Sequence, residues 1–98
     1  MDESTTGDVH ALLEGVDGPE SFLRFVRGLI ADRKWAENLP DTSPWGSRGG
    51  WENDTITEFL GAAAAWARDS RFGESQGLQG ASPWRVFATF LYCGKIYE

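Results

Sequence analysis

The sequence has one cysteine and one histidine, which narrows the chemistry it can support. Cys93 alone cannot form an internal disulfide, and one thiol cannot build a multi-thiolate zinc site. His10 lies in an acidic N-terminal stretch, where a lone histidine is more often solvated than catalytic. We therefore expect no metal site and no bound cofactor. A chain with so few thiols suits a reducing compartment.

Long apolar runs are also missing. No stretch approaches the roughly 20 apolar residues that span a membrane. No apolar leader follows a basic start. We expect a soluble, cytoplasmic protein with no membrane partner.

Excess positive charge is absent too, since the formal net charge is −6. Residues 1–20 contain six acids and no lysine or arginine, while residues 21–98 contain nine acids and nine bases. The bases form no stripe that could neutralise phosphates, so we expect no nucleic-acid binding. The acidic arm is either a contact for a basic partner or, more commonly, a solubilising tail.

What is present is enough for one core. With 98 residues and 41% hydrophobic content, the chain has the size of one globular domain. We expect a single helical domain over residues 1–98. A polar arm at 1–7 and long loops at 37–53 and 72–82 complete it.

The clearest helix signal lies over residues 54–71. Thr55 and Glu58 have the spacing of a capping box, in which each side chain satisfies the backbone N–H of the other residue. Apolar residues then recur with the 3.6-residue period of a helix and form one buried stripe. We predict that this helix is the centre of the core.

Three other segments predict helices. A helix over 19–36 starts with Pro19 in its first turn, and its charged residues, Asp32 among them, lie mostly off the apolar stripe. A last helix starts at Ser82 and Pro83 and ends near Gly94. A short helix capped by Asp8 carries apolar residues up to Val16.

No segment alternates with period two, so the predicted fold is all-α: a small bundle of three main helices plus a short N-terminal helix. The last helix is apolar nearly all round, which is typical of a central helix or of an interface, including a homodimer interface. We expect Ile96 and Tyr97 to pack back on the body. The predicted core is Phe22, Val26, Leu29, Phe59, Leu60, Ala63, Trp66, Trp84, Phe87 and Leu91.

The stretch 37–53 is the least regular, with two prolines and three glycines. A connection of this length is either functional or ordered by its own side chains. We expect Trp51 to be buried and Trp45 to be partly exposed. The candidate partner-contact residues are Trp45, Arg48 and Trp51.

The polar residues around the predicted main helix allow two interpretations. Glu52 and Glu58 have the residue type of an acid/base pair. The structural alternative is stronger, because Asn53 and Asp54 suit helix caps and Glu58 closes the capping box. We expect no catalytic residue.

Several short motifs together resemble a small family of bacterial domains of unknown function. They are Trp51-Glu52-Asn53, Phe59-Leu60 with Ala65-Trp66 and Asp69, Pro83-Trp84 with Phe87-Ala88, and Lys95-Ile96-Tyr97-Glu98. The resemblance covers about residues 19–98. It implies a small all-helical domain and no assigned activity. The chain departs from the pattern at PDTSPWGSRGG before Trp51 and at Arg71-Phe72-Gly73.

Two functional hypotheses from different classes remain. The first is a non-enzymatic protein-interaction module, with contacts from the 40–51 loop and the acidic arm. The second is a small-ligand binder or enzyme that uses Glu52 and Glu58 beside a tryptophan-lined cleft. The second requires the two carboxylates to converge in a concave pocket.

Overall fold

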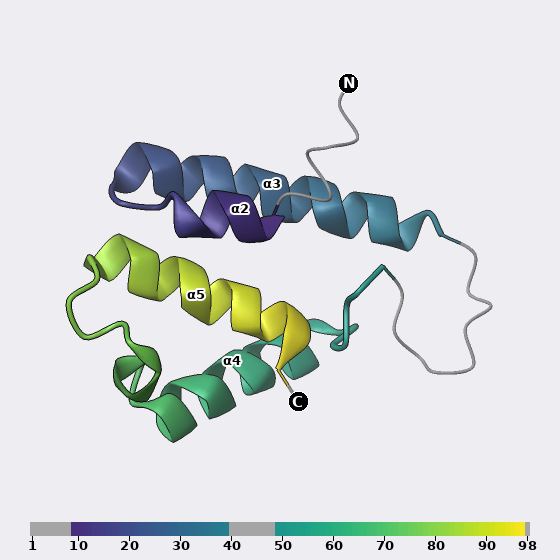
Figure 1. The fold of residues 1–98 in the computed structure, drawn as a ribbon. Coiled ribbons are helices and arrows are strands. Elements are labelled where there is room, and N and C mark those ends of the chain that lie inside the picture. Colours follow the sequence, from purple (N-terminus) through teal and green to yellow (C-terminus); the bar gives the residue numbers. More distant parts are fainter. Residues whose placement is uncertain (1–8, 40–48, 98) are drawn as a thin grey trace.

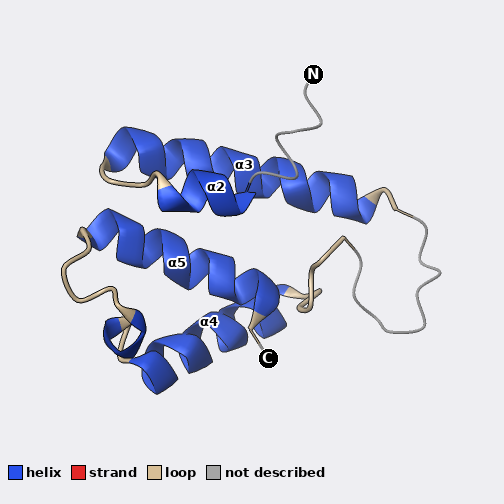
Figure 2. Cartoon of the chain, in the orientation of Figure 1, coloured by secondary structure: helices blue, strands red, loops and turns tan. Residues whose placement is uncertain are grey.

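The computed structural model describes residues 9–39 and 49–97. The described residues form helices and connections but no β-strand (Figure 2). The elements are α2 (Val9–Glu14), α3 (Pro19–Glu37), α4 (Ile56–Ser70), the 3-10 helix η1 (Glu74–Gln76) and α5 (Pro83–Ile96). The predicted all-α fold with three main helices and a short N-terminal helix is confirmed. Asp8, the predicted cap of α2, lies outside the described residues.

The central element is α5. It packs against α4 on one side and against α2 and α3 on the other, and α3 and α4 do not contact each other (Figure 1). The expectation that the helix of residues 56–70 is central is therefore wrong. The physical reason is that α5 is apolar on nearly every side, so it can bury more than one face, whereas α4 buries a single stripe.

The molecule is flat as a consequence. Its extents are 41 × 32 × 18 Å. Packed helices lie about 8–10 Å apart, so the thin dimension has room for no more than two helix layers. The helices α3, α5 and α4 form one layer, and only α2 adds to it.

Local signals set the helix starts. The Thr55 side chain accepts a hydrogen bond from the Glu58 backbone N–H at 3.0 Å, and the capping box is complete. Pro19 begins α3, and the Ser82 side chain accepts from the backbone N–H of Arg85 at the start of α5. These predicted starts are confirmed.

The predicted end of α5 at Gly94 is wrong, because the helix continues to Ile96. Gly94 does not end the helix but allows α4 to pack closely against α5. A Cβ atom there would lie 2.8 Å from the ring of Phe59, so only glycine lets α4 approach this closely.

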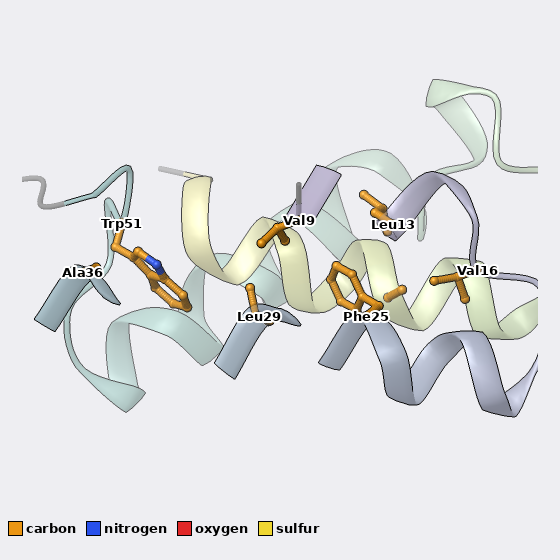
Figure 3. Packing of buried hydrophobic residues seen from close by; sticks show 8 residues of the cluster. Val9, Leu13, Val16, Phe25, Leu29, Ala36 and Trp51 are labelled. Atoms are coloured by element: carbon orange, nitrogen blue, oxygen red, sulfur yellow. The ribbon is translucent and has the colours of Figure 1, made fainter. Parts of the chain in front are cut away.

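The first hydrophobic cluster joins α2, α3 and α5 (Figure 3). Phe25 is fully buried at its centre, and Trp51 closes the end near Ala36. The buried members are Val9, Leu13, Val16, Phe25, Leu29, Ala36, Trp51 and Ala88. Phe22, Val26, Phe59 and Leu91, all predicted as core, are partly buried and pack against this cluster.

A second, smaller cluster lies between α4 and α5. It contains Trp66, Ala67 and Cys93, with Leu78, Phe90 and Tyr97 packed against it. Trp66 is 2% exposed and donates from its indole N–H to the side-chain oxygen of Gln76 at 2.8 Å. Ala63 on the same helix is also fully buried, as its position on the stripe predicts.

Three predicted core residues are exposed. Leu60 is 52% exposed, Trp84 38% and Phe87 54%. Trp84 is partly covered by its ring contact with Phe22 of α3, and Phe87 borders a hollow between the start of α5 and the connection from α4. Leu60 lies beside the buried stripe of α4 and has no facing helix. These assignments to the core are wrong.

Cys93 gives the first testable prediction, because burial raises the pKa of its thiol to about 11. Thiolates are the reactive form, so we expect iodoacetamide near pH 8 to modify folded protein about a hundredfold more slowly than protein unfolded in urea. Mass spectrometry over time measures both rates. Since the folded pKa lies above the ordinary value of about 8.5, the free energy of unfolding should fall as pH rises from about 8.5 toward 11. Equal labelling rates in the two states would contradict this burial.

None of the described helices is long and apolar enough to cross a membrane.

Candidate functional site

A buried polar cluster lies where three parts of the chain meet. Asp32 of α3 is 1% exposed. Its Oδ2 atom accepts from the indole N–H of Trp51 at 2.9 Å and from the ammonium group of Lys95 at 2.7 Å. We call Asp32, Trp51 and Lys95 the Asp32 cluster.

The cluster ties α3, the segment before α4 and the end of α5 together. A buried carboxylate is costly unless charge and hydrogen bonds compensate it, and Lys95 and Trp51 supply both. Two cations also lie over the Trp51 ring. The ammonium group of Lys95 is 5.6 Å from the ring centroid, and the guanidinium carbon of Arg33 is 5.0 Å from it.

Arg33 extends this arrangement to the surface. Its Nε donates to Glu37 at 2.8 Å, and its Nη2 donates to the carboxylate of Asp54 at 2.9 Å. The hydrogen bond to Glu37 is the largest cause that raises the pKa of Arg33, with a smaller opposing effect of burial. The guanidinium therefore stays charged and fixed over Trp51.

Asn53 caps α5, not the helix that follows it in the chain. Its side-chain amide donates to the backbone oxygens of Gly94 and Tyr97, both at 2.9 Å. The last carbonyls of a helix have no partner within the helix, so an amide with two N–H groups suits this end. The backbone N–H of Glu52 adds a bond of 2.9 Å to the oxygen of Lys95. The prediction of Asn53 as an N-cap is thus wrong, because a tertiary contact uses its side chain.

The residue that follows α5, Tyr97, also contacts α4. The hydroxyl group of Tyr97 donates to the Asp69 carboxylate at 2.7 Å, which lowers the pKa of Asp69 and raises the pKa of Tyr97. Tyr97 packs back on the body as expected. Ile96 remains 40% exposed, so it does not.

A groove of about 310 Å³ lies beside Trp51. It is lined by Arg33, Glu37, Trp51, Asn53, Asp54, Thr55, Ile56 and Phe59. The cleft is tryptophan-lined, as the second hypothesis requires, but Glu52 and Glu58 do not line it. Glu58 accepts from the backbone N–H groups of Asp54 and Thr55 at 2.9 and 3.3 Å. The proposed pair of converging carboxylates is therefore not formed, because helix capping uses Glu58.

The three predicted partner-contact residues do not form a contact surface in the described part of the chain. Trp45 and Arg48 lie outside the described residues. Trp51 is 6% exposed and belongs to the Asp32 cluster, so it is buried as expected but offers no contact surface. The part of the chain that the structure describes holds no group of three or more potential metal-ligating side chains.

A surface that the sequence did not predict lies along α3 and α5. Leu23 and Ile30 of α3 are 49% and 50% exposed, and Trp84 and Phe87 of α5 are 38% and 54% exposed. Phe22 and Trp84 join the two helices through a ring contact with centroids 5.5 Å apart. We call the following set the open apolar face: Leu23, Val26, Ile30, Trp84, Phe87 and Leu91.

The open apolar face is separate from the surface that α2 covers. Leu12 of α2 contacts α3 at Gly28, and the backbone oxygen of Glu14 accepts from Arg85 of α5 at 3.1 Å. Residues 23, 26 and 30 lie on another flank of α3 than Gly28, at the 100° per residue of a helix. Residues 84, 87 and 91 are likewise turned away from Arg85.

Basic side chains alternate with the apolar ones on this stripe of α3. Leu23, Arg27, Ile30 and Lys34 are spaced by four, three and four residues, which places them on one helix face. Arg27 and Lys34 are exposed. Neither has an ion-pair partner among the described residues. This stripe therefore combines apolar contact with positive charge.

The model of one protein family, described as a family of unknown function (DUF7660), matches residues 19–98. The chain belongs to this family. The DUF7660 match begins at the first residue of α3, so it includes α3, α4 and α5 and leaves α2 outside. The resemblance suggested by the short motifs agrees with this range, and the function of DUF7660 is unknown. Searches of curated proteins and of solved structures return no match.

Sequence reasoning missed the Asp32 cluster, although one signal existed. Asp32 lies seven residues after Phe25 and four before Ala36, on the stripe that α3 buries. A carboxylate at such a position requires a buried partner. The identity of the partners could not be read from the sequence, since Lys95 is 63 positions away.

Proposed function

We propose that this protein is a non-enzymatic interaction module that binds an amphipathic helix with acidic flanks on a partner protein. The contact surface is the open apolar face. We place this activity in the bacterial cytoplasm, in keeping with the single thiol and the resemblance of the motifs.

The exposure of large apolar side chains supports this proposal. Soluble monomers rarely expose a contiguous apolar patch without a use for it. Fully burying a leucine or phenylalanine side chain contributes about 1.5–3 kcal/mol, so covering four half-exposed side chains contributes roughly half of that amount for each. Two of the four are aromatic, and aromatic residues dominate protein interfaces.

The charges on the same stripe support an acidic partner. Arg27 and Lys34 alternate with Leu23 and Ile30, so a helix lying there meets positive charge along one edge of its apolar stripe. Opposite charges would steer the encounter and set its register. An amphipathic helix with leucines spaced at i, i+3 and i+7 has the matching apolar stripe.

Charge argues against a second copy as the occupant. A twofold contact through this face would bring the α3 stripes of two chains together. Arg27 and Lys34 would then face like charges, which is unfavourable. The homodimer through α5 that the sequence suggests is therefore an outcome that the test must distinguish.

The test uses a labelled synthetic helix of about 20 residues with leucines on one stripe and glutamates beside them. A counterpart has lysines in place of the glutamates. Fluorescence anisotropy should show that the wild-type chain binds the acidic peptide at least about tenfold more tightly than the basic one. Binding should weaken as salt rises.

The matched variants are Phe87→Arg and Ile96→Arg. Both residues are exposed on α5, but they lie nine positions apart and so on opposite flanks of the helix. Phe87→Arg should weaken binding of the acidic peptide at least about tenfold, and Ile96→Arg should leave it unchanged. Equal binding by both variants, equal binding of both peptides, or a stable dimer in light scattering that Phe87→Arg abolishes would each overturn the proposal.

A further inference from the structure

The short helix α2 and the turn that follows it lie outside the DUF7660 match but supply three deeply buried residues. Val9, Leu13 and Val16 are 3%, 4% and 4% exposed. They pack against α3 and α5 in the first hydrophobic cluster (Figure 3). The family domain therefore presents an apolar groove between α3 and α5, and α2 fills it in this chain.

The groove has a shaped socket. Gly28 lies in the middle of α3, where glycine is unfavourable for helix formation. A Cβ atom at this position would overlap the Cδ1 atom of Leu12, so the glycine makes room for a leucine of the docked helix. This is knob-in-socket packing between α2 and a residue inside the family match.

The contact between α2 and the groove leaves one buried hydrogen-bond donor without an acceptor. Arg85 donates from Nη1 to the backbone oxygen of Glu14, but its Nε is buried and has no hydrogen-bond partner among the described residues. A buried donor without an acceptor weakens the docked state. A helix of six residues is also too short to be stable without its contacts.

We propose that the groove between α3 and α5 is a second docking site, which takes an amphipathic helix of a partner protein, and that α2 is its displaceable occupant. The partner helix carries a leucine for the Gly28 socket and a side-chain oxygen that accepts from Nε of Arg85. The short connection at residues 15–18 gives α2 a high effective concentration at the groove. A partner helix must therefore make more favourable contacts with the groove than α2 does.

The first measurement is native-state hydrogen exchange on the full chain. We expect the amides of α2 to exchange through a local opening that leaves α3 and α5 protected. Exchange of α2 only together with α5, by global unfolding, would overturn the proposal. This measurement needs no variant.

The second measurement uses full-length variants and a labelled peptide of residues 8–18. Leu13→Asp should release α2, while Ala11→Asp introduces the same charge at an exposed position of α2. The peptide should bind the Leu13→Asp chain at least about tenfold more tightly than the Ala11→Asp chain. A peptide with Leu12→Ala should lose most of this binding.

Two controls separate the outcomes. Phe87→Arg added to Leu13→Asp should not alter peptide binding, which distinguishes this groove from the open apolar face. Exchange of α2 between two copies would appear as a dimer in light scattering and would overturn the proposal of a partner helix. Absence of peptide binding to a folded Leu13→Asp chain would also overturn it. If circular dichroism shows that the Leu13→Asp chain is unfolded, the hydrogen-exchange measurement on the wild-type chain tests the proposal.

Discussion

Replacing Asp32 by alanine is expected to lower the free energy of unfolding by about 3–5 kcal/mol, because one partner of a buried ion pair is removed. The carboxylate is 1% exposed and accepts from both Lys95 and Trp51. Without it, the ammonium group and the indole N–H lose their acceptor in a largely buried site. Urea denaturation followed by tryptophan fluorescence measures the change.

Two further substitutions separate charge from packing. Asp32→Asn keeps an oxygen for the indole N–H of Trp51 but removes the charge opposite Lys95, so it should cost less than alanine. In the double variant Asp32→Ala with Lys95→Met, no buried charge is left unpaired, and the loss should be smaller than the sum of the two single losses. Additive losses would show that the two side chains do not act as a pair.

A surface ion pair supplies the matched comparison. Asp54 bonds to Arg33 at 2.9 Å, but its side chain is 60% exposed. Asp54→Ala should therefore cost no more than about 1 kcal/mol. If Asp32→Ala were as mild as Asp54→Ala, the Asp32 cluster would not stabilise the fold.

Replacing Trp66 by alanine should also cost about 3–5 kcal/mol, as expected for truncation of a buried aromatic side chain. Trp66 is 2% exposed and belongs to the cluster between α4 and α5. It also holds Gln76 of η1 through its indole N–H, so its loss removes packing and a hydrogen bond together. This cost is a large share of the roughly 5–15 kcal/mol that stabilise a small domain.

Denaturant titration compares Trp66→Ala with two controls. Trp66→Phe keeps an aromatic ring without the donor and should be less destabilising than alanine. Trp35→Ala makes the same truncation at a tryptophan that is 45% exposed and should cost much less. An unfolding midpoint for Trp66→Ala close to that of wild type would contradict the assignment of Trp66 to the core.

Both large effects concern residues that hold α5 to its neighbours. Asp32 joins α3 to the end of α5 through Lys95, and Trp66 joins α4 to α5 through the second cluster. Since α3 and α4 do not contact each other, these two connections maintain the flat layer.

The candidate site was only partly predictable. Trp51 could be expected to be buried, because it is a large aromatic residue in a long irregular stretch. The role of Asn53 could not be expected, since its local sequence equally suits an N-cap. Its amide instead serves carbonyl groups at positions 94 and 97, more than 40 residues away.

The sequence by itself determined the local elements and little else. Pro19, the Thr55–Glu58 capping box and Ser82–Pro83 specify where helices begin, because capping and periodicity depend on residues within about four positions of each other. The tertiary structure alone decided that α5 is central, that Asp32 meets Lys95, and that Trp84 and Phe87 remain exposed. An apolar stripe specifies that a helix buries a face but not which helix covers it, and that choice depends on contacts between distant segments.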